Sequence, residues 1–168
     1  AISLDHTQIL GNSVEEIARE KAGILKPNGT LVLYPKQEAI ALSTIKSIAE
    51  SLNNKVVVPD VAAVENISLG LRIASFSYLG ETYNIDLLGE HQVYNAITAL
   101  SAIHEMRKLG YEITAEAIKT GLSEAKIPSR LEIISRAPLV ILDGTHNPGG
   151  AGVLADALET YLAGKKII

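Results

Sequence analysis

The sequence contains no cysteine and no tryptophan, and aromatic residues make up only 4% of its 168 residues. Without cysteine, the chain can form neither a disulfide scaffold, nor a cysteine-based zinc site, nor a thiol nucleophile. It has no apolar run near the ~20 residues needed to cross a bilayer, and no signal peptide at its start. These absences favour the reducing cytosol, so we expect a cytoplasmic protein with no membrane partner.

The net charge is also small, because 15 Lys and Arg oppose 19 Asp and Glu to give −4. Slight acidity argues against broad binding to nucleic acid, so an anionic ligand would need a locally positive pocket. Apolar residues make up 47% of the chain, which is enough for a real core and argues against long disorder.

Both ends of the sequence have the character of interrupted strands. Ala1–Leu4 reads as the end of a buried strand, and Lys165–Ile168 reads as the beginning of another. Severed strands leave unpaired edges, which complete domains seldom tolerate. We therefore expect the chain to be an internal fragment of a longer enzyme.

Between the ends, helical and extended patterns alternate. Helices are predicted at 13–22, 37–52, 91–109, 114–125 and 151–162, and strands at 30–34, 56–58 (within the segment 55–59), 69–78, 82–88, 130–135 and 138–142. The strands at 69–78 and 82–88 should form an antiparallel hairpin around Leu79-Gly80-Glu81. The alternation elsewhere predicts an α/β fold, with a domain boundary at Arg136-Ala137-Pro138.

Three segments of the sequence contain candidate functional residues. Lys21 shares the face of Val14 and Ile17 in the first helix, so it is either a snorkelling side chain or a functional lysine at the edge of a site. His6 follows a strand end, where parallel α/β sheets place their sites, although a lone loop histidine is often merely solvated. Asp143 and His146 lie in a Gly/Pro-rich strand–helix connection that offers free N–H groups to an anion, or forms an ordinary capped turn.

Two further side chains have both a functional and an ordinary interpretation. Asn95, early in the predicted helix at 91–109, could contact a base edge or face water. Arg130 follows Pro128-Ser129 and enters a strand, where it could bind phosphate or form a surface ion pair. No Walker A motif occurs in these residues.

Four segments in this order resemble the folylpolyglutamate synthase/dihydrofolate synthase family of the Mur ligase superfamily. They are Leu4-Asp5-His6-Thr7 with Leu10-Gly11; Ile17-Ala18-Arg19-Glu20-Lys21-Ala22-Gly23-Ile24; Leu88-Gly89-Glu90-His91-Gln92 with Asn95-Ala96; and Arg130-Leu131-Glu132 followed by Leu142-Asp143-Gly144-Thr145-His146-Asn147-Pro148. The resemblance implies that residues 1–136 are the latter part of a P-loop-type central ATPase domain with an antiparallel hairpin insertion. Residues 137–168 would begin a Rossmann-like C-terminal domain.

The resemblance also implies roles for individual residues. His6 resembles a magnesium ligand and Lys21 the family's carbamylated lysine, whose carbamate also binds the ion. Asn95 resembles the residue that contacts adenine, and Arg130 the arginine that reaches the phosphates of ATP. Asp143 and His146 resemble the pair from the C-terminal domain that contacts ribose and phosphate. Partial burial would favour the neutral amine of Lys21, the form that reacts with CO₂, and the carbamate product is a hard oxygen ligand suited to Mg²⁺.

The reaction implied by the resemblance is ATP-dependent amide formation between L-glutamate and folate or dihydropteroate, through an acyl phosphate. ATP and Mg²⁺ would be required, and we expect a monomer in the full-length protein. The absent P-loop predicts that these 168 residues alone have no turnover. Ser129 stands where relatives commonly have glycine, and Thr145 where alanine is frequent. Two alternatives stay open, namely a Mur-type ligase acting on a different acid and a non-catalytic nucleotide-binding domain.

Overall fold

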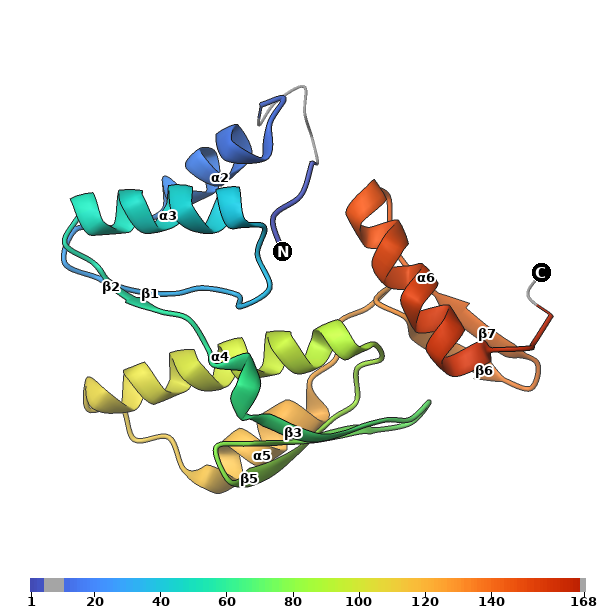
Figure 1. The fold of residues 1–168 in the computed structure, drawn as a ribbon. Helices are drawn as coiled ribbons and strands as arrows, with labels where there is room; N and C mark the ends of the chain where they lie inside the picture. The colour runs from blue at the N-terminus through green and yellow to red at the C-terminus, as the bar shows by residue number, and fades with distance from the viewer. Residues whose placement is uncertain (5–10, 167–168) are drawn as a thin grey trace. The chain divides into compact units, whose positions relative to one another are not determined.

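The computed structural model describes residues 1–4 and 11–166, which form two compact units (Figure 1). The first unit contains Ala1–Val61 and Ile97–Tyr111, and the second contains Ala62–Ala96 and Glu112–Ile168. Helix α4 (Glu90–Lys108) contributes residues to both units. Helices and small sheets alternate along the chain, which confirms the predicted α/β class.

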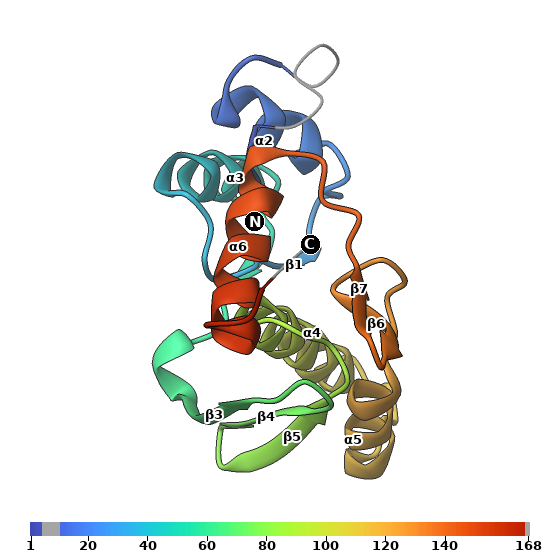
Figure 2. The same cartoon turned by 90° about the vertical axis from the view of Figure 1, so that its right-hand side faces the viewer.

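The first unit is built on two parallel strands, β1 (Thr30–Val32) and β2 (Lys55–Val57). Helix α3 (Ala39–Ser51) connects them, as parallel strands require a crossover. Helix α2 (Val14–Ala22) packs against α3 (Figures 1 and 2). The core of this unit consists of Ile2, Ile17, Ala18, Ala22, Leu33, Ala41 and Ile45. All four predicted elements are confirmed, and their bounds differ from the predicted ones by at most two residues at either end.

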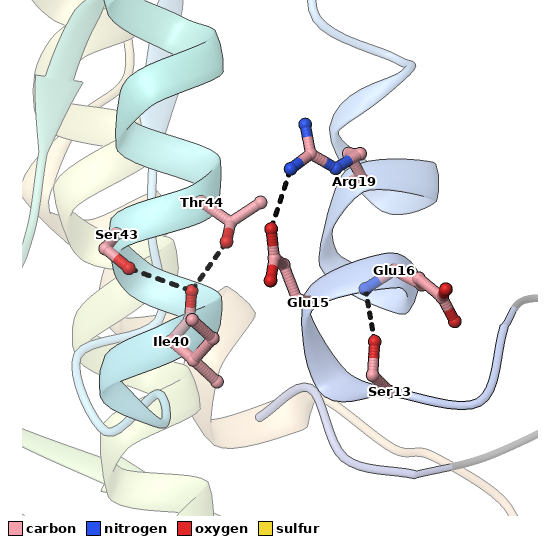
Figure 3. A network of polar contacts seen from close by, with 7 residues as sticks. All are labelled: Ser13, Glu15, Glu16, Arg19, Ile40, Ser43 and Thr44. Carbon is pink, nitrogen blue, oxygen red and sulfur yellow. Dashed lines mark hydrogen bonds and ion pairs between the residues drawn. The ribbon is translucent and has the colours of Figure 1, made fainter.

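The start of α2 follows the predicted capping pattern. The Ser13 hydroxyl accepts a hydrogen bond from the Glu16 amide at 3.2 Å (Figure 3). The Glu16 carboxylate caps one residue earlier than expected, because it accepts from the Asn12 amide at 2.7 Å. Glu15 and Arg19 form an exposed i,i+4 ion pair at 2.7 Å on the same helix. The bond to Ser13 satisfies one amide that the first helical turn leaves without an intrahelical partner.

A three-residue ion cluster joins β2 to the C-terminal part of α4. Glu105 pairs with Lys108 at 2.7 Å through one oxygen and with Lys55 through the other, and its side chain is only 11% exposed. Hydrogen bonds from Lys108 and Lys55 lower the pKa of Glu105 to about 2. The carboxylate is therefore favoured in the folded state.

We expect Glu105→Gln to lower the melting temperature at pH 7 and to change its dependence on acid. The folded pKa lies below the ordinary glutamate value of about 4.3, so the stabilisation is complete above that pH and is lost as pH falls toward 2. Thermal melts should show a gap between the two proteins that closes across this window. Exposed Glu50→Gln is the control and should melt like the unsubstituted protein at every pH. A gap independent of pH would contradict the assignment.

The second unit starts at Ala62, within the one-turn helix η1 (Val61–Ala63), and continues with an antiparallel sheet of order β3-β4-β5. Its strands are β3 (Val64–Leu69), β4 (Ala74–Tyr78) and β5 (Glu81–Ile85). Leu79 and Gly80 form the predicted hairpin turn, both with positive φ, at +51° and +82°. Helix α5 (Ala115–Glu124) packs against β5, and Lys119 pairs with Glu81 at 2.8 Å (Figure 2).

The single strand predicted at 69–78 is wrong. The chain reverses at Gly70–Ile73, where the Gly70 amide donates to the Ile73 carbonyl at 3.2 Å. Two strands result, β3 and β4, and they pair with each other. The prediction also missed most of β3, because its polar residues break the apolar alternation and Asn66 takes a left-handed conformation with φ +53°.

The rest of the second unit is the antiparallel hairpin β6 (Glu132–Arg136) and β7 (Leu139–Leu142), followed by helix α6 (Pro148–Leu162). Helix α6 starts three residues earlier than predicted, because Asn147 caps it and Pro148 suits its first turn. The centre of this packing is Leu88, Leu131 and Ala157, with Ile133, Ile141, Leu154 and Tyr161 against them. The expected domain boundary lies in the connection between β6 and β7 and stays a prediction.

The predicted terminal strands are not found. Residues 1–4 form no strand, since the Ile2 amide donates to a side chain, Gln37 Oε1, at 2.7 Å. Lys165 and Lys166 are likewise not in a strand, and the next two residues lie outside the described part. Within residues 1–4 and 11–166, no helix is long and apolar enough to cross a membrane.

Candidate functional site

Asp143, the first residue after β7, joins two loops of the second unit. Its Oδ2 accepts a hydrogen bond from the Leu131 amide at 2.9 Å, and its Oδ1 accepts from the Thr145 amide at 2.8 Å. A third bond runs between the same loops, from the Gly144 amide to the Ser129 carbonyl at 2.7 Å. The carboxylate thus fixes the segment at 129–131 beside the strand–helix connection at 143–145.

Arg130 lies at the centre of an unusual turn. Its neighbours Ser129 and Leu131 both have left-handed backbones, with φ of +59° and +49°. Leu131 is 4% exposed and anchors the turn in the core, while Arg130 is exposed. Non-glycine residues adopt such a conformation only where surrounding bonds impose it. Here the bonds are those from Leu131 to Asp143 and from the Ser129 amide to Glu132 Oε2 at 2.9 Å. The φ of Ser129 also explains why glycine suits this position.

The Asp143 carboxylate is stabilised in its charged form. Burial alone would raise the pKa of Asp143, but hydrogen bonds from Thr145 and from the Leu131 amide, together with the charge of Arg130, lower it. The positive charge of Arg130 thus lies within electrostatic reach of the Asp143 carboxylate. An exposed guanidinium beside a fixed carboxylate can bind the anionic and hydroxyl groups of one ligand.

His146 and Asn147 complete the connection to α6. The Nδ1 of His146 lies 2.9 Å from the Gly144 carbonyl oxygen, and the residue is exposed. The Asn147 side chain caps the helix by accepting from the Gly150 amide at 2.7 Å. The predicted cluster of Asp143 and His146 on one connection is therefore present, close to Arg130.

Arg130 also borders a pocket of about 270 Å³. Its lining includes three cations and two acids amid apolar side chains: Lys126, Arg130, Arg136, Asp86 and Glu132, with Leu71, Leu87, Leu88, Ile127, Pro128, Leu131 and Ile133. The Arg136 guanidinium donates a hydrogen bond to the Leu71 carbonyl at 3.4 Å, and this bond fixes its position in the lining of the pocket. The excess of cations supplies the locally positive surface that an anion would need in this acidic chain.

Asn95 lies on α4 and is exposed. Its Nδ2 donates a hydrogen bond to Oε1 of buried Gln92 at 2.9 Å. This bond sets the orientation of the Asn95 side-chain amide, including its carbonyl oxygen. This arrangement is compatible with the predicted contact to a base edge.

Sequence reasoning missed two side chains near this cluster, His91 and Tyr161. Burial lowers the pKa of His91. The charge of Arg130 lowers this pKa further, whereas the Asp143 carboxylate raises it. The His91 imidazole therefore lies within electrostatic reach of Arg130 and Asp143. Tyr161 Oη accepts a hydrogen bond from the Gly89 amide at 2.8 Å. The motif Leu88–Gln92, which contains His91, could have indicated that residue, but no sequence pattern indicated Tyr161.

Comparison with known proteins shows which proteins this chain resembles. No protein-family model matches the sequence. The dihydrofolate synthase/folylpolyglutamate synthase of Bacillus subtilis is 35% identical over 99% of this chain and 40% of its own. A solved complex of FPGS with AMPPCP and folate superposes with a TM-score of 0.81 at 26% identity, over 99% of this chain and 42% of the other. Over nearly its whole length, this chain is similar to proteins of the folylpolyglutamate synthase/dihydrofolate synthase family.

A third relative agrees with this similarity. The folylpolyglutamate synthase of Mycobacterium tuberculosis, solved with ADP and AMPPCP, has a TM-score of 0.75 at 28% identity. The match includes 93% of this chain and 37% of the M. tuberculosis protein. The chain thus spans about 40% of the length of the family members it matches.

Lys21, the lysine that the family resemblance singles out, is exposed. The buried residues of α2 are Ile17, Ala18 and Ala22, so the exposure of Lys21 agrees with the snorkelling interpretation, while its functional role stays a prediction. The amine lies one residue before the helix C-terminus, and its long chain reaches solvent from there. The burial that would favour a neutral amine is therefore not found for this residue.

The magnesium site that the family resemblance predicts is not formed by the described residues. His6 lies outside them, and among residues 1–4 and 11–166 no three His, Asp or Glu side chains gather as metal ligands. The described residues consequently do not by themselves fit the ion.

Proposed function

We propose that this chain is part of an ATP-dependent carboxylate–amine ligase that adds L-glutamate to folate or dihydropteroate. The observation that carries the proposal is the 35% identity to a dihydrofolate synthase/folylpolyglutamate synthase over 99% of the chain. The Arg130–Asp143 cluster supports it, because it offers a fixed carboxylate and an exposed cation beside a positive pocket. Folate, dihydropteroate and glutamate are the proposed partners, and nucleic acid and membranes are not.

We propose that the second unit contributes to the ATP site. Arg130 would bind the phosphates, Asp143 and His146 the ribose and phosphate, and Asn95 the adenine. In this scheme residues 1–136 belong to a P-loop-type central ATPase domain and residues 137–168 begin a Rossmann-like C-terminal domain. Asp143 and His146 would then come from the proposed C-terminal domain, so closure of the two domains would complete the nucleotide site.

In the proposed reaction, a carboxylate oxygen of the folate-side substrate attacks the γ-phosphorus of ATP, and ADP leaves with the bridging oxygen. The amine of glutamate then attacks the acyl carbon and loses a proton. The C–O bond breaks, and phosphate departs with one oxygen of the original carboxylate. Catalysis of this kind depends on positioning and charge neutralisation, to which Arg130 would contribute at the transferred phosphoryl group.

Mg²⁺, with His6 and the carbamate of Lys21 as its ligands, remains part of the proposal through the family resemblance alone. Because the described residues do not fit the ion by themselves, no step of the reaction is derived through it. A cytoplasmic, monomeric full-length enzyme is likewise proposed.

The function can be tested by isotope transfer in the full-length protein. Folate or dihydropteroate with ¹⁸O in the reacting carboxylate, incubated with ATP and glutamate, should give one ¹⁸O atom in each released phosphate. Unlabelled phosphate accompanying amide formation would refute the acyl phosphate, and an absence of glutamate-dependent ADP release would refute the ligase. The isolated 168-residue chain serves as the control and should release no ADP, since it lacks a Walker A motif.

A further inference from the structure

We propose that Tyr161 is a positioning residue for nucleotide binding, which rests on the function proposed above. Its hydroxyl oxygen accepts a hydrogen bond from the Gly89 amide at 2.8 Å. The two residues are 72 positions apart in the chain, and both belong to the second unit. The bond therefore ties the last turn of α6 to the segment that starts α4.

The environment of Gly89 makes this bond difficult to replace. Gly89 is buried with φ +99°, and a Cβ at this position would lie 2.6 Å from Nδ1 of His91. A larger residue at position 89 would therefore strain the backbone and displace the His91 ring. A buried N–H without an acceptor costs free energy, and Tyr161 Oη is the acceptor that this structure provides.

The ring of Tyr161 is held by apolar packing while its hydroxyl makes the directional contact. The side chain packs on the cluster of Leu88, Leu131 and Ala157, so it contacts the residues that flank Gly89 and Arg130 in sequence. Apolar contacts resist separation but do not fix the rotation of a helix, whereas a hydrogen bond restricts both distance and angle.

Two hydrogen bonds therefore restrain α6 and the connection that leads to it. In that connection, Asp143 accepts from the Leu131 amide five residues before the helix begins, and in the last turn of the helix Tyr161 accepts from the Gly89 amide. Residues 148 and 161 are separated by about 20 Å along a helix at 1.5 Å per residue. Two ties so far apart fix the orientation of α6, and with it the direction of His146 relative to Arg130. They also fix the start of α4, which carries Asn95. Tyr161 would therefore act on the nucleotide through these residues without touching it.

The test is Tyr161→Phe in the full-length protein, with AMPPCP binding measured by calorimetry. Phenylalanine keeps the packing and removes only the acceptor, so we expect AMPPCP to bind about 3- to 10-fold more weakly, the range of one lost net hydrogen bond. Two controls separate positioning from stability. Leu154→Ala removes packing in the same cluster but keeps the bond, and should lower the melting temperature without changing AMPPCP affinity below the transition. Tyr111→Phe alters an exposed tyrosine and should change neither quantity.

The possible outcomes are distinct. Unchanged affinity in Tyr161→Phe would overturn the positioning role, and so would an equal loss of affinity in Leu154→Ala, because general destabilisation would then explain both. If the unsubstituted protein bound no AMPPCP, the proposed function itself would fail and this inference with it.

Discussion

Replacing Arg130 by alanine in the full-length enzyme should weaken ATP binding by about 10- to 100-fold. A hydrogen bond to a charged group contributes roughly 1.5–3 kcal/mol, which corresponds to this range. The turn around Arg130 is anchored by buried Leu131 and by Asp143, so the alanine variant should keep its fold. Direct binding of AMPPCP and the KM for ATP should change together, while the KM for glutamate should change little.

Arg72→Ala is the matched control for this substitution. Arg72 is an exposed arginine of the same unit, placed in the turn between β3 and β4, and its loss removes the same net charge. Equal effects in both variants would show that Arg130 acts only through the overall field of the protein. An Arg130→Lys variant should recover part of the affinity, because lysine supplies a point charge without the planar pair of donors.

Lys21→Ala should reduce kcat of the full-length enzyme by at least about 100-fold. The reason lies in the proposed carbamate. Loss of a residue that merely supports a metal ligand costs about 10- to 100-fold, so loss of a ligand should cost more. Added bicarbonate should not rescue the variant, because alanine has no amine with which CO₂ can react. Steady-state turnover at saturating Mg²⁺, with and without bicarbonate, is the measurement.

Lys26→Ala is the control for the lysine experiment. Lys26 is exposed and lies five positions further along the chain, beyond the end of α2. It should retain full turnover. Since Lys21 is itself exposed in this structure, unchanged activity of Lys21→Ala would assign it to the surface and remove the carbamate from the proposal.

Local signals in the sequence predicted most elements of the fold. Ser13 and Thr114 were recognised as caps, and each accepts the amide three residues later. The Leu79-Gly80 turn was recognised from glycine between two apolar runs. The corner at Gly70–Ile73 was missed, because Leu69 and Leu71 continue the apolar pattern through a reversal that depends on pairing with β4. Long-range pairing overrides local preference at such places.

The candidate site was predictable only in part. Asp143 and Arg130 were found from their segments, but the bond from the Leu131 amide to Asp143 joins loops 12 residues apart and required the structure. Helical periodicity placed Lys21 on the face of Val14 and Ile17, and its exposure agrees with the snorkelling interpretation given for it. Tyr161 had no signal at all, since its role depends on a contact with Gly89, far away in the sequence.

The most direct test of the account is a crystal structure of the full-length enzyme with AMPPCP. We expect the guanidinium of Arg130 within hydrogen-bond distance of phosphate oxygens, with the Asp143 carboxylate on the ribose and Asn95 at the adenine edge. A nucleotide bound elsewhere, with Arg130 and Asp143 contacting only each other's loops and solvent, would contradict it.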